Sequence, residues 1–343
     1  MISRFRALLD CLIFAGLVLA ALLTLSGLLG AYVPALDLIN HFQLPLFLSG
    51  SLAFAMTFVW PYRLPRLKRP AQVIILAALL ASSGLIGTEA VKRLMGAEQS
   101  PEVLAASNKR VLKYLSFNIY LGTWDGIGLA ETVRRYDPDI ATLQEYAPKR
   151  FRRQPDLKRD YPYQARCGYW RRCTLAILSK HPMDEIKRFD LGPEVTRNPM
   201  HGKMLAATVR VKGSAPIRIY NVHLAWPLPV AQQRRQMEEI AAIIKRERKR
   251  YPQQVLSGDF NSTGWAFGID RLAANAGMNR QSHFVPTFPS PNSRLKGFLQ
   301  LPAFLSLDHI MVSAPLSSGP VVRVATEIGD HWPILTDLYV PIQ

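Results

Sequence analysis

Apolar residues are concentrated in the first quarter of the chain, where they form three long runs, 11–33, 43–60 and 71–88. A helix needs about 20 apolar residues to cross a hydrocarbon core about 30 Å thick, and all three runs are near that length. They predict a membrane domain, residues 1–94, with three transmembrane helices. The second run is the weakest of the three, because Pro45 interrupts it.

The first run follows Arg4 and Arg6, as the apolar part of a secretory signal peptide would. It is too long for that part, however, and it lacks a small-x-small cleavage site. Two more apolar runs come after it. We therefore expect the first run to be kept as a membrane span.

Basic residues in the short loops predict the orientation of the spans. The loop 61–70 carries four Arg or Lys residues, whereas the loop 31–42 carries none. Because Lys and Arg are retained on the cytoplasmic side, the loop 61–70 is expected inside. Three spans then place the rest of the chain on the periplasmic side of a bacterial inner membrane, or on the extracellular side. Loss of the second span would reverse this topology.

From residue 109 onward, short apolar runs alternate with helical patterns, which is typical of a mixed α/β domain, 109–343. Residues 95–108 are rich in Ala, Ser and Glu and are expected to be a linker. The predicted strands are Val111–Phe117, Ile140–Leu143, Thr174–Leu178, Met204–Val211, Ile217–Val222, Val255–Ser257, Leu307–Val312 and Ile334–Val340. The predicted helices are Gly128–Tyr136, Val230–Arg250 and Ala266–Ala276.

Several predicted strands run directly into polar residues of the types that active sites use. These residues are Asn118, Glu145, His223, Asp259 and Asn261. Side chains from distant parts of an α/β chain converge at strand ends. The pattern therefore predicts one shared cleft.

The segment Leu256–Asn261 is the sharpest single motif. Asp259 and Asn261 are two residues apart, so in an extended segment they would point the same way, and Gly258 would let the backbone approach a ligand closely. A carboxylate beside an amide can hold a nucleophilic water and a phosphate oxygen. Taken alone, the same residues also fit an ordinary turn after a strand.

Two further segments add acids and histidines. Asp330 and His331 stand just before the last predicted strand, and Asp308 and His309 stand within the strand before it. A histidine held by a carboxylate serves phosphoryl and acyl chemistry, because the acid fixes its tautomer and raises its basicity. Of the two histidines, His309 also fits a purely structural role.

The order and spacing of these motifs resemble the endonuclease/exonuclease/phosphatase family, which includes deoxyribonucleases, abasic-site endonucleases, neutral sphingomyelinases and inositol phosphate phosphatases. The matching segments are Leu115–Asn118, Leu143–Glu145, Asn221–Leu224, Gly258–Asn261, Leu307–Ile310 and Asp330–His331. Six motifs in the correct order are more specific than any one of them. The resemblance implies a four-layer α/β sandwich of two packed mixed β-sheets flanked by helices, here preceded by three transmembrane helices.

The resemblance also implies a metal centre. Glu145, with Asn118 near it, would bind Mg²⁺ or Mn²⁺, ions that prefer oxygen donors and keep several waters. Asp330 would complete the shell of the metal or of its water. Asp259 would orient or deprotonate the attacking water, and Asn261 would hold that water or a phosphate oxygen.

Two histidines complete the centre that the resemblance implies. His331 would contact the scissile phosphate and stabilise the charge that develops on it, with Asp308 hydrogen-bonded to its far nitrogen. His223 would be a second phosphate contact or the proton donor to the leaving oxygen.

The formal net charge is +17, and residues 101–343 account for +13 of it. A basic domain favours anionic partners such as nucleic acid, phospholipid head groups or phosphorylated metabolites. Cys167 and Cys173 flank a short loop and fit a disulfide or a reduced pair equally well. With no second Cys pair or His-x-His nearby, a zinc site is improbable.

These features predict a membrane-anchored, Mg²⁺- or Mn²⁺-dependent hydrolase that cleaves a phosphodiester bond by attack of water, with membrane lipids as partners of its N-terminal helices. One alternative is a phosphatase or a phospholipase C-like enzyme that acts on lipid head groups. A non-catalytic phosphate-binding module would require a lost metal ligand or histidine, and none is missing. A transporter is disfavoured because the spans lack internal charges, with Asp10 and Glu89 at their ends.

Overall fold

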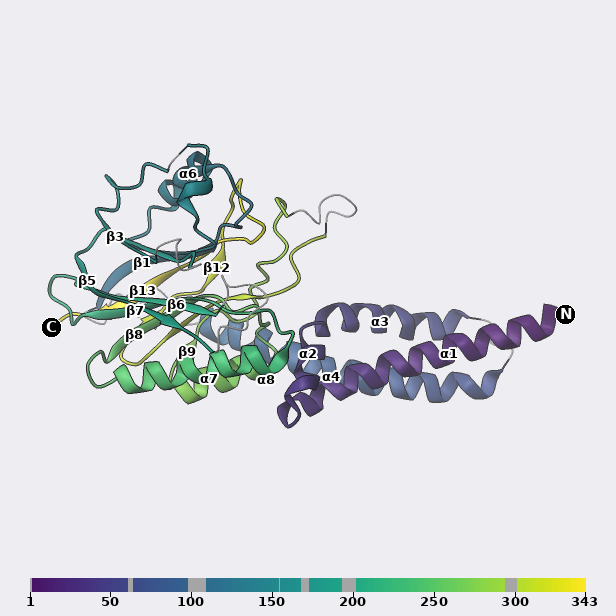
Figure 1. Ribbon diagram of the computed structural model, residues 1–343. Coiled ribbons are helices and arrows are strands. Elements are labelled where there is room, and N and C mark those ends of the chain that lie inside the picture. Colours follow the sequence, from purple (N-terminus) through teal and green to yellow (C-terminus); the bar gives the residue numbers. More distant parts are fainter. Residues whose placement is uncertain are drawn as a thin grey trace. The chain divides into compact units, whose positions relative to one another are not determined.

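The structure is a computed structural model that describes residues 2–60, 64–97, 109–153, 155–167, 173–192, 202–293 and 301–343. It divides into two compact units (Figure 1). The first, the N-terminal unit, comprises Met1–Val91 and Trp265–Phe267, and the second, the α/β unit, comprises Lys92–Gly264 and Gly268–Gln343. Most of the predicted linker 95–108 lies outside the described residues.

The N-terminal unit is helical, as the apolar runs predict. Its elements are α1 (Ile2–Ser26), η1 (Gly27–Ala31), η2 (Pro34–Leu36), α2 (Asp37–Asn40), α3 (Gln43–Val59) and α4 (Pro65–Ala97). Two helical stretches, Phe5–Ala31 and Pro65–Met95, are long and apolar enough to cross a membrane. The predicted second span is long and apolar enough to cross a membrane only when Pro34–Asn40 and Gln43–Val59 are counted as one span. The two helical pieces are bent by 61° relative to each other.

Polar side chains inside the N-terminal unit are paired with one another. The Gln43 amide donates to Asn40 Oδ1 over 3.0 Å, and the Ser82 hydroxyl donates to Gln43 Oε1 over 2.6 Å.

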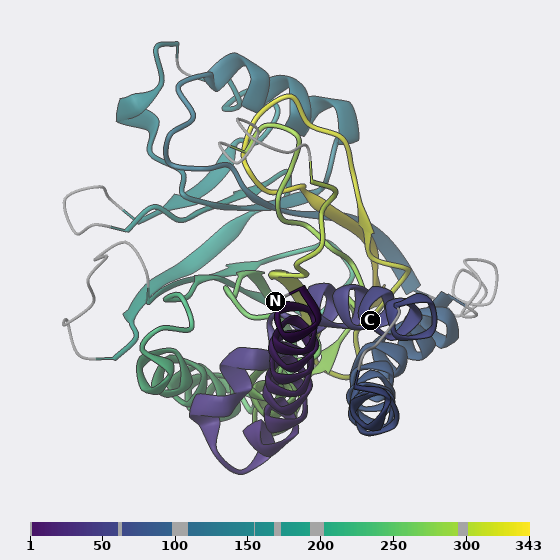
Figure 2. The same ribbon diagram turned by 90° about the vertical axis from the view of Figure 1, so that its right-hand side faces the viewer.

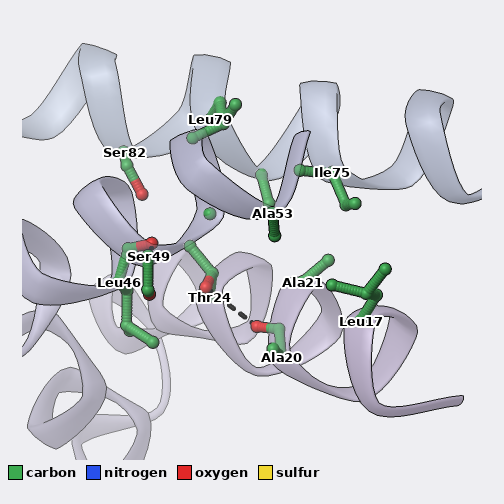
Figure 3. Close-up of a pocket in the computed structure, with 12 residues that line it drawn as sticks. Leu17, Ala20, Ala21, Thr24, Leu46, Ser49, Ala53, Ile75, Leu79 and Ser82 are labelled. Atoms are coloured by element: carbon green, nitrogen blue, oxygen red, sulfur yellow. Dashed lines mark hydrogen bonds between the residues drawn. The ribbon is translucent and has the colours of Figure 1, made fainter. Parts of the chain in front are cut away.

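Nearby, α1, α3 and α4 enclose a small, mainly apolar cavity of about 170 Å³ (Figure 3). Because α1 begins earlier than the predicted span, Asp10 lies inside the apolar stretch, where it accepts a hydrogen bond from Trp60 Nε1 over 3.1 Å.

The α/β unit contains two mixed sheets. The first has the strand order β11-β13-β1-β2-β4-β3, with β12 also paired to β13, and the second has the order β5-β6-β7-β8-β10-β9. In the first sheet the strands are β1 (Lys109–Asn118), β2 (Ile140–Gln144), β3 (Tyr163–Arg166), β4 (Ala176–Ser179), β11 (Ser317–Ser318), β12 (Val322–Arg323) and β13 (Ile334–Pro341). In the second they are β5 (Met183–Asp190), β6 (Lys203–Val209), β7 (Ile217–His223), β8 (Gln253–Asp259), β9 (Asn279–Arg280) and β10 (Asp308–Val312).

Helices cover the outer faces of both sheets, so the unit has four layers. The helix α6 (Gly126–Tyr136) lies on the first sheet, and α7 (Val230–Glu247) and α8 (Phe267–Ala276) lie on the second. Figure 2 shows α6 and α7 on opposite sides of the two sheets. One apolar core lies between the sheets and includes Leu112 and Ile219. A separate core lies under each helical layer. The predicted four-layer sandwich is therefore confirmed.

The sequence pattern identified the buried strands and missed the exposed or very short ones. All eight predicted strands are present within a few residues of their predicted ends. The missed strand β5 alternates half-buried and exposed residues, many of them charged, so its apolar signal is weak. The other missed strands have two to four residues. Cys167 and Cys173 form a disulfide beside β3 and β4.

Gly258 is required by the neighbouring strand. Its φ is +141°, and a Cβ atom there would lie 2.0 Å from the carbonyl oxygen of Val222 on β7. The backbone of β8 therefore fits against β7 only because this residue has no side chain. Our expectation that Gly258 also lets the backbone approach a ligand stays a prediction.

Candidate active site

The eight residues predicted for the active centre come from one edge of the two sheets. The first sheet supplies Asn118, Glu145, Asp330 and His331, and the second supplies His223, Asp259, Asn261 and Asp308. β1 and β2 are parallel, as are β7 and β8, so their ends share an edge. Because β13 and β10 run antiparallel to β1 and β8, they begin at that same edge.

The side-chain amide of Asn118 links the two halves of the site. It donates to Asp259 Oδ2 over 2.9 Å and to Glu145 Oε1 over 3.2 Å. Its oxygen accepts a hydrogen bond from the backbone N–H of Tyr120 over 3.0 Å. Asn118 is only 1% exposed, so these partners hold it in one orientation, with its N–H groups toward the carboxylates.

Two site residues have left-handed backbone conformations, with φ of +57° at Glu145 and +48° at Asn261. Such conformations cost a non-glycine residue of order 1–3 kcal/mol and cluster at functional sites. The Glu145 carboxylate also accepts a hydrogen bond from the backbone N–H of Leu121 over 2.5 Å. Asn261 adopts a left-handed turn conformation, so our prediction that the segment is extended was wrong at this residue. Its amide donates instead to the carbonyl of Leu224 over 2.9 Å.

Asp259 is the meeting point of the charged groups. One carboxylate oxygen accepts from the backbone N–H of Asn261 over 2.8 Å. The other lies 3.6 Å from His223 Nε2 and 3.8 Å from His331 Nε2. Burial raises the pKa of Asp259 to about 7, although the charge of His331 opposes the shift. A carboxylate with a pKa near neutrality is suited to accept a proton.

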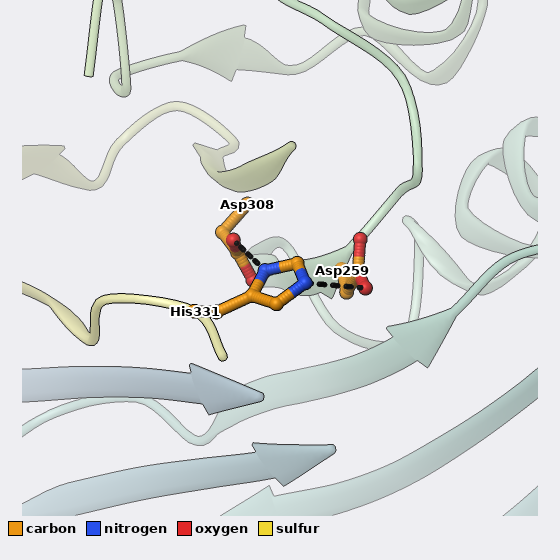
Figure 4. Close-up of side chains that lie close together, drawn as sticks. All are labelled: Asp259, Asp308 and His331. Atoms are coloured by element: carbon orange, nitrogen blue, oxygen red, sulfur yellow. Dashed lines mark hydrogen bonds and ion pairs between the residues drawn. The ribbon is translucent and has the colours of Figure 1, made fainter. Parts of the chain in front are cut away.

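His331 lies between two buried carboxylates (Figure 4). Its Nδ1 is 2.7 Å from Asp308 Oδ2, as the resemblance implies for the pair. Burial alone would lower the pKa of His331, but the carboxylates of Asp308 and Asp259 outweigh it and raise the pKa to about 10. The imidazole is therefore a cation at neutral pH.

His223 has the opposite protonation state. Its Nε2 is 3.8 Å from Glu145 Oε1, in addition to its approach to Asp259. Burial, together with the positive charge of His331, lowers the pKa of His223 to about 3. One site thus holds a neutral and a charged histidine on either side of one carboxylate. Groups whose pKa values are driven apart in this way mark acid and base roles.

The donor set of the site fits a hard divalent cation. Buried Oδ1 atoms of Asp308 and Asp330 have no hydrogen-bond partner among the described residues. Burial raises the pKa of Asp330 to about 6, reinforced by the charge of Glu145, although the charge of His331 opposes the shift. Asp259, Asp308 and His331 also form a compact group of possible ligands, but His331 is already bonded to Asp308.

His309 has the structural role that we considered for it. It is fully buried, its Nδ1 lies 3.0 Å from Ser282 Oγ, and its Nε2 lies 2.9 Å from the carbonyl oxygen of Ser262. Both ring nitrogens are used to join β10 to neighbouring loops. The adjacent Asp308, by contrast, faces His331.

One further segment borders the site, Thr287–Ser290, which the sequence pattern did not predict. The ring of Phe288 lies 5.1 Å from the ring of His331, measured between centroids. The segment is rich in Pro and Ser, which predicts only a loop. The aromatic residue in such a loop was the one available signal.

A model of the endonuclease/exonuclease/phosphatase family matches residues 115–331, more than half of the chain and a span that includes all eight residues. The chain therefore belongs to this family. It is a metal-dependent hydrolase that acts on phosphate ester bonds. No curated protein matches the chain significantly.

Solved structures share the fold of the α/β unit. Sphingomyelinase C from Streptomyces griseocarneus is 17% identical, with a TM-score of 0.51 over 66% of this chain and 99% of that chain. Truncated TDP2 from Caenorhabditis elegans is 18% identical, with a TM-score of 0.52 over 67% of this chain and 98% of that chain. A beta toxin mutant from Staphylococcus aureus with bound magnesium ions is 16% identical, with a TM-score of 0.51 over 66% and 99%.

The left-handed backbone at Glu145 yields a stability prediction. Both Glu145→Gly and Glu145→Ala remove the carboxylate, but only glycine adopts a positive φ without strain. We expect the glycine variant to be more stable than the alanine variant by about 1 kcal/mol, measured from thermal unfolding midpoints of the full chain. Both should be inactive.

The matched control is Glu131, an exposed residue within α6. There Glu131→Gly should be less stable than Glu131→Ala by about 1 kcal/mol, because glycine disfavours a helix interior. Strain at Glu145 would be contradicted if the stability difference between the glycine and alanine variants had the same sign at both positions.

Proposed function

We propose that the chain is a membrane-anchored phosphodiesterase that hydrolyses its substrate with a bound Mg²⁺ or Mn²⁺ ion and an attacking water. The observation that carries this proposal is the placement of Asp259 between His223 and His331, which have opposite pKa shifts. A carboxylate base, a fixed cation and an oxygen-rich acidic pocket are the parts that hydrolysis of a phosphate ester needs.

Glu145 and Asp330 would hold the metal, and Asn118 would orient Glu145. This assignment refines our expectation for Asn118, whose amide N–H groups are directed at the carboxylates and cannot bind a cation. When bound, a divalent ion neutralises phosphate charge and lowers the pKa of a coordinated water. Asp330 has a buried oxygen without a partner among the described residues, which supports its place in this shell.

Asp259 would take the proton from the attacking water. Its hydrogen bonds from Asn118 and from the backbone of Asn261 fix the carboxylate, and its raised pKa of about 7 makes it a useful base near neutral pH. In this arrangement Asn261 would have two roles, one for its backbone and one for its side chain. Its backbone holds Asp259, while its side-chain oxygen can contact the water or the phosphate.

His331 would stabilise the charge that develops on the phosphate. Asp308 keeps it protonated and oriented through the 2.7 Å contact at Nδ1, which leaves Nε2 directed into the site. The lowered pKa of His223 favours one of the two roles that we considered for it, the phosphate contact, over proton donation by a charged imidazole.

The second candidate is a phospholipase C-like reaction on lipid head groups. The specific observation in its favour is the pair of helical stretches in the same chain that are long and apolar enough to cross a membrane. The structural neighbour named sphingomyelinase C shares the fold, which is compatible with such a substrate.

Replacement of the proposed base should abolish turnover while the fold persists. We expect Asp259→Asn to lower kcat by about 10²–10³-fold, the effect typical of losing one preorganised group. The measurement is hydrolysis of bis(p-nitrophenyl) phosphate by the full chain with Mg²⁺. The control is Asp337→Asn, the same change on an exposed position of β13, which should retain wild-type kcat. Equal rates for the two variants would refute the role of Asp259.

Removal of divalent metal should stop the reaction. We expect a chelator to abolish hydrolysis and Mg²⁺ or Mn²⁺ to restore it, because the oxygen-rich site matches these ions. The assay would compare DNA, RNA, sphingomyelin, phosphatidyl head groups and inositol phosphates. Hydrolysis of the lipid substrates alone would select the second candidate, and activity that survives chelation would overturn the metal mechanism.

We also propose that the α/β unit faces the periplasmic or extracellular side, following the distribution of basic residues in the loops. A C-terminal fusion to alkaline phosphatase, which is active only after export, should then be active in bacterial cells. If a cytoplasmic reporter at the same position were active instead, the orientation would be reversed.

A further inference from the structure

The missed segment Thr287–Ser290 is bonded to the loop that carries His331. Thr287 accepts a hydrogen bond at its carbonyl from the backbone N–H of Trp332 over 2.8 Å. Ser290 donates its backbone N–H to the carbonyl of Asp330 over 2.7 Å and its hydroxyl to the carbonyl of Gly329 over 2.7 Å. The segment is therefore hydrogen-bonded to this loop on both sides of His331.

The same segment is bonded to the chain that leads into β10. Phe288 and Leu305 exchange backbone hydrogen bonds of 3.0 Å in both directions, and Thr287 donates its N–H to Leu305 over 2.8 Å. The Thr287 hydroxyl also accepts from the backbone N–H of Leu307 over 3.3 Å. Leu307 directly precedes Asp308, so one short segment connects the two residues of the buried histidine–carboxylate pair.

The Phe288 side chain packs on His331 itself. The two ring planes are inclined by 53°, and Phe288 is half-buried whereas His331 is 5% exposed. The two nitrogens of His331 face Asp308 and Asp259, so its carbon edge and faces need an apolar neighbour. The Phe288 ring fills that place and limits rotation of the imidazole away from Asp308.

We infer that Phe288 and Ser290 are positioning residues that hold the His331 imidazole in its catalytic orientation. Phe288 acts on the ring, and Ser290 acts on the backbone that carries it. The inference rests on the proposed function, because it assigns these residues a purpose in the step that His331 performs.

Kinetic assays of the full chain test the inference with two variants, Phe288→Leu and Ser290→Ala. Each should lower kcat for bis(p-nitrophenyl) phosphate by about 10- to 100-fold, the cost of a small misplacement of a catalytic group, with little change in KM. Phe288→Tyr keeps the ring and should keep the rate. Phe189→Leu is the matched control, because Phe189 on β5 is another partly buried ring, and β5 lies two strands from the strand that carries His223.

A double-mutant cycle separates positioning from general loss of structure. In a His331→Ala background, Phe288→Leu should have no further effect on the residual rate, since the group that it positions is absent. An equal fold-loss in both backgrounds would overturn the inference.

Chemical modification supplies a readout that does not need activity. Diethyl pyrocarbonate acylates an unprotonated nitrogen of an accessible imidazole, and the modified residues can be identified by mass spectrometry. In the unaltered chain both nitrogens of His331 face carboxylates, so this residue should react slowly. His331 should react several-fold faster in Phe288→Leu and Ser290→Ala than in the unaltered chain, whereas the buried His309 should not change. Unchanged reactivity of His331 would overturn the inference. If the unaltered chain hydrolyses no phosphodiester, the proposed function fails, and the modification rates still decide the positioning of His331.

Discussion

The hydrogen bond from Asn118 to Asp259 is the contact on which the candidate site depends, because it joins the two sheets where the proposed catalytic residues meet. Apolar packing between the sheets is non-directional and does not fix their relative register. Directional contacts behind the site do so. Gln144 donates to Asn221 over 2.7 Å, and the Tyr114 hydroxyl lies 2.7 Å from the Ser257 hydroxyl. All of these polar groups are buried, so breaking one leaves an unsatisfied group at a cost of about 1–3 kcal/mol.

Sheet register in turn decides the electrostatics of the site. Each sheet brings one histidine, and both histidines are buried against the same carboxylate, Asp259. Asp308 lies at the other nitrogen of His331, whereas the second carboxylate near His223, that of Glu145, approaches the same nitrogen as Asp259. That difference makes one imidazole a cation and leaves the other neutral, although the two residues are chemically identical. A buried charge requires such a partner, since desolvation otherwise favours the neutral form.

Features that depend on local pattern were predicted well, and those that depend on neighbours were not. The strand ends at Asn118, Glu145 and His223 follow from apolar runs that stop at a polar residue. The strand-packing role of Gly258 was missed, because the atom that requires it, the Val222 carbonyl oxygen, belongs to another strand. The segment around Phe288 was missed because its partner His331 is distant in the chain. The exposed edge strand β5 has too little apolar periodicity to be recognised.

The sequence by itself determined the family, the mixed α/β class, the set of eight polar residues and the apolar helices, because each of these is written in residue type, order and spacing. Only the tertiary structure decided which nitrogen of His331 meets Asp308, which way the Asn118 amide points, and which backbone positions adopt left-handed conformations. The physical reason is that hydrogen bonds and desolvation depend on distances of a few ångströms between residues far apart in sequence. A linear pattern contains no such distances.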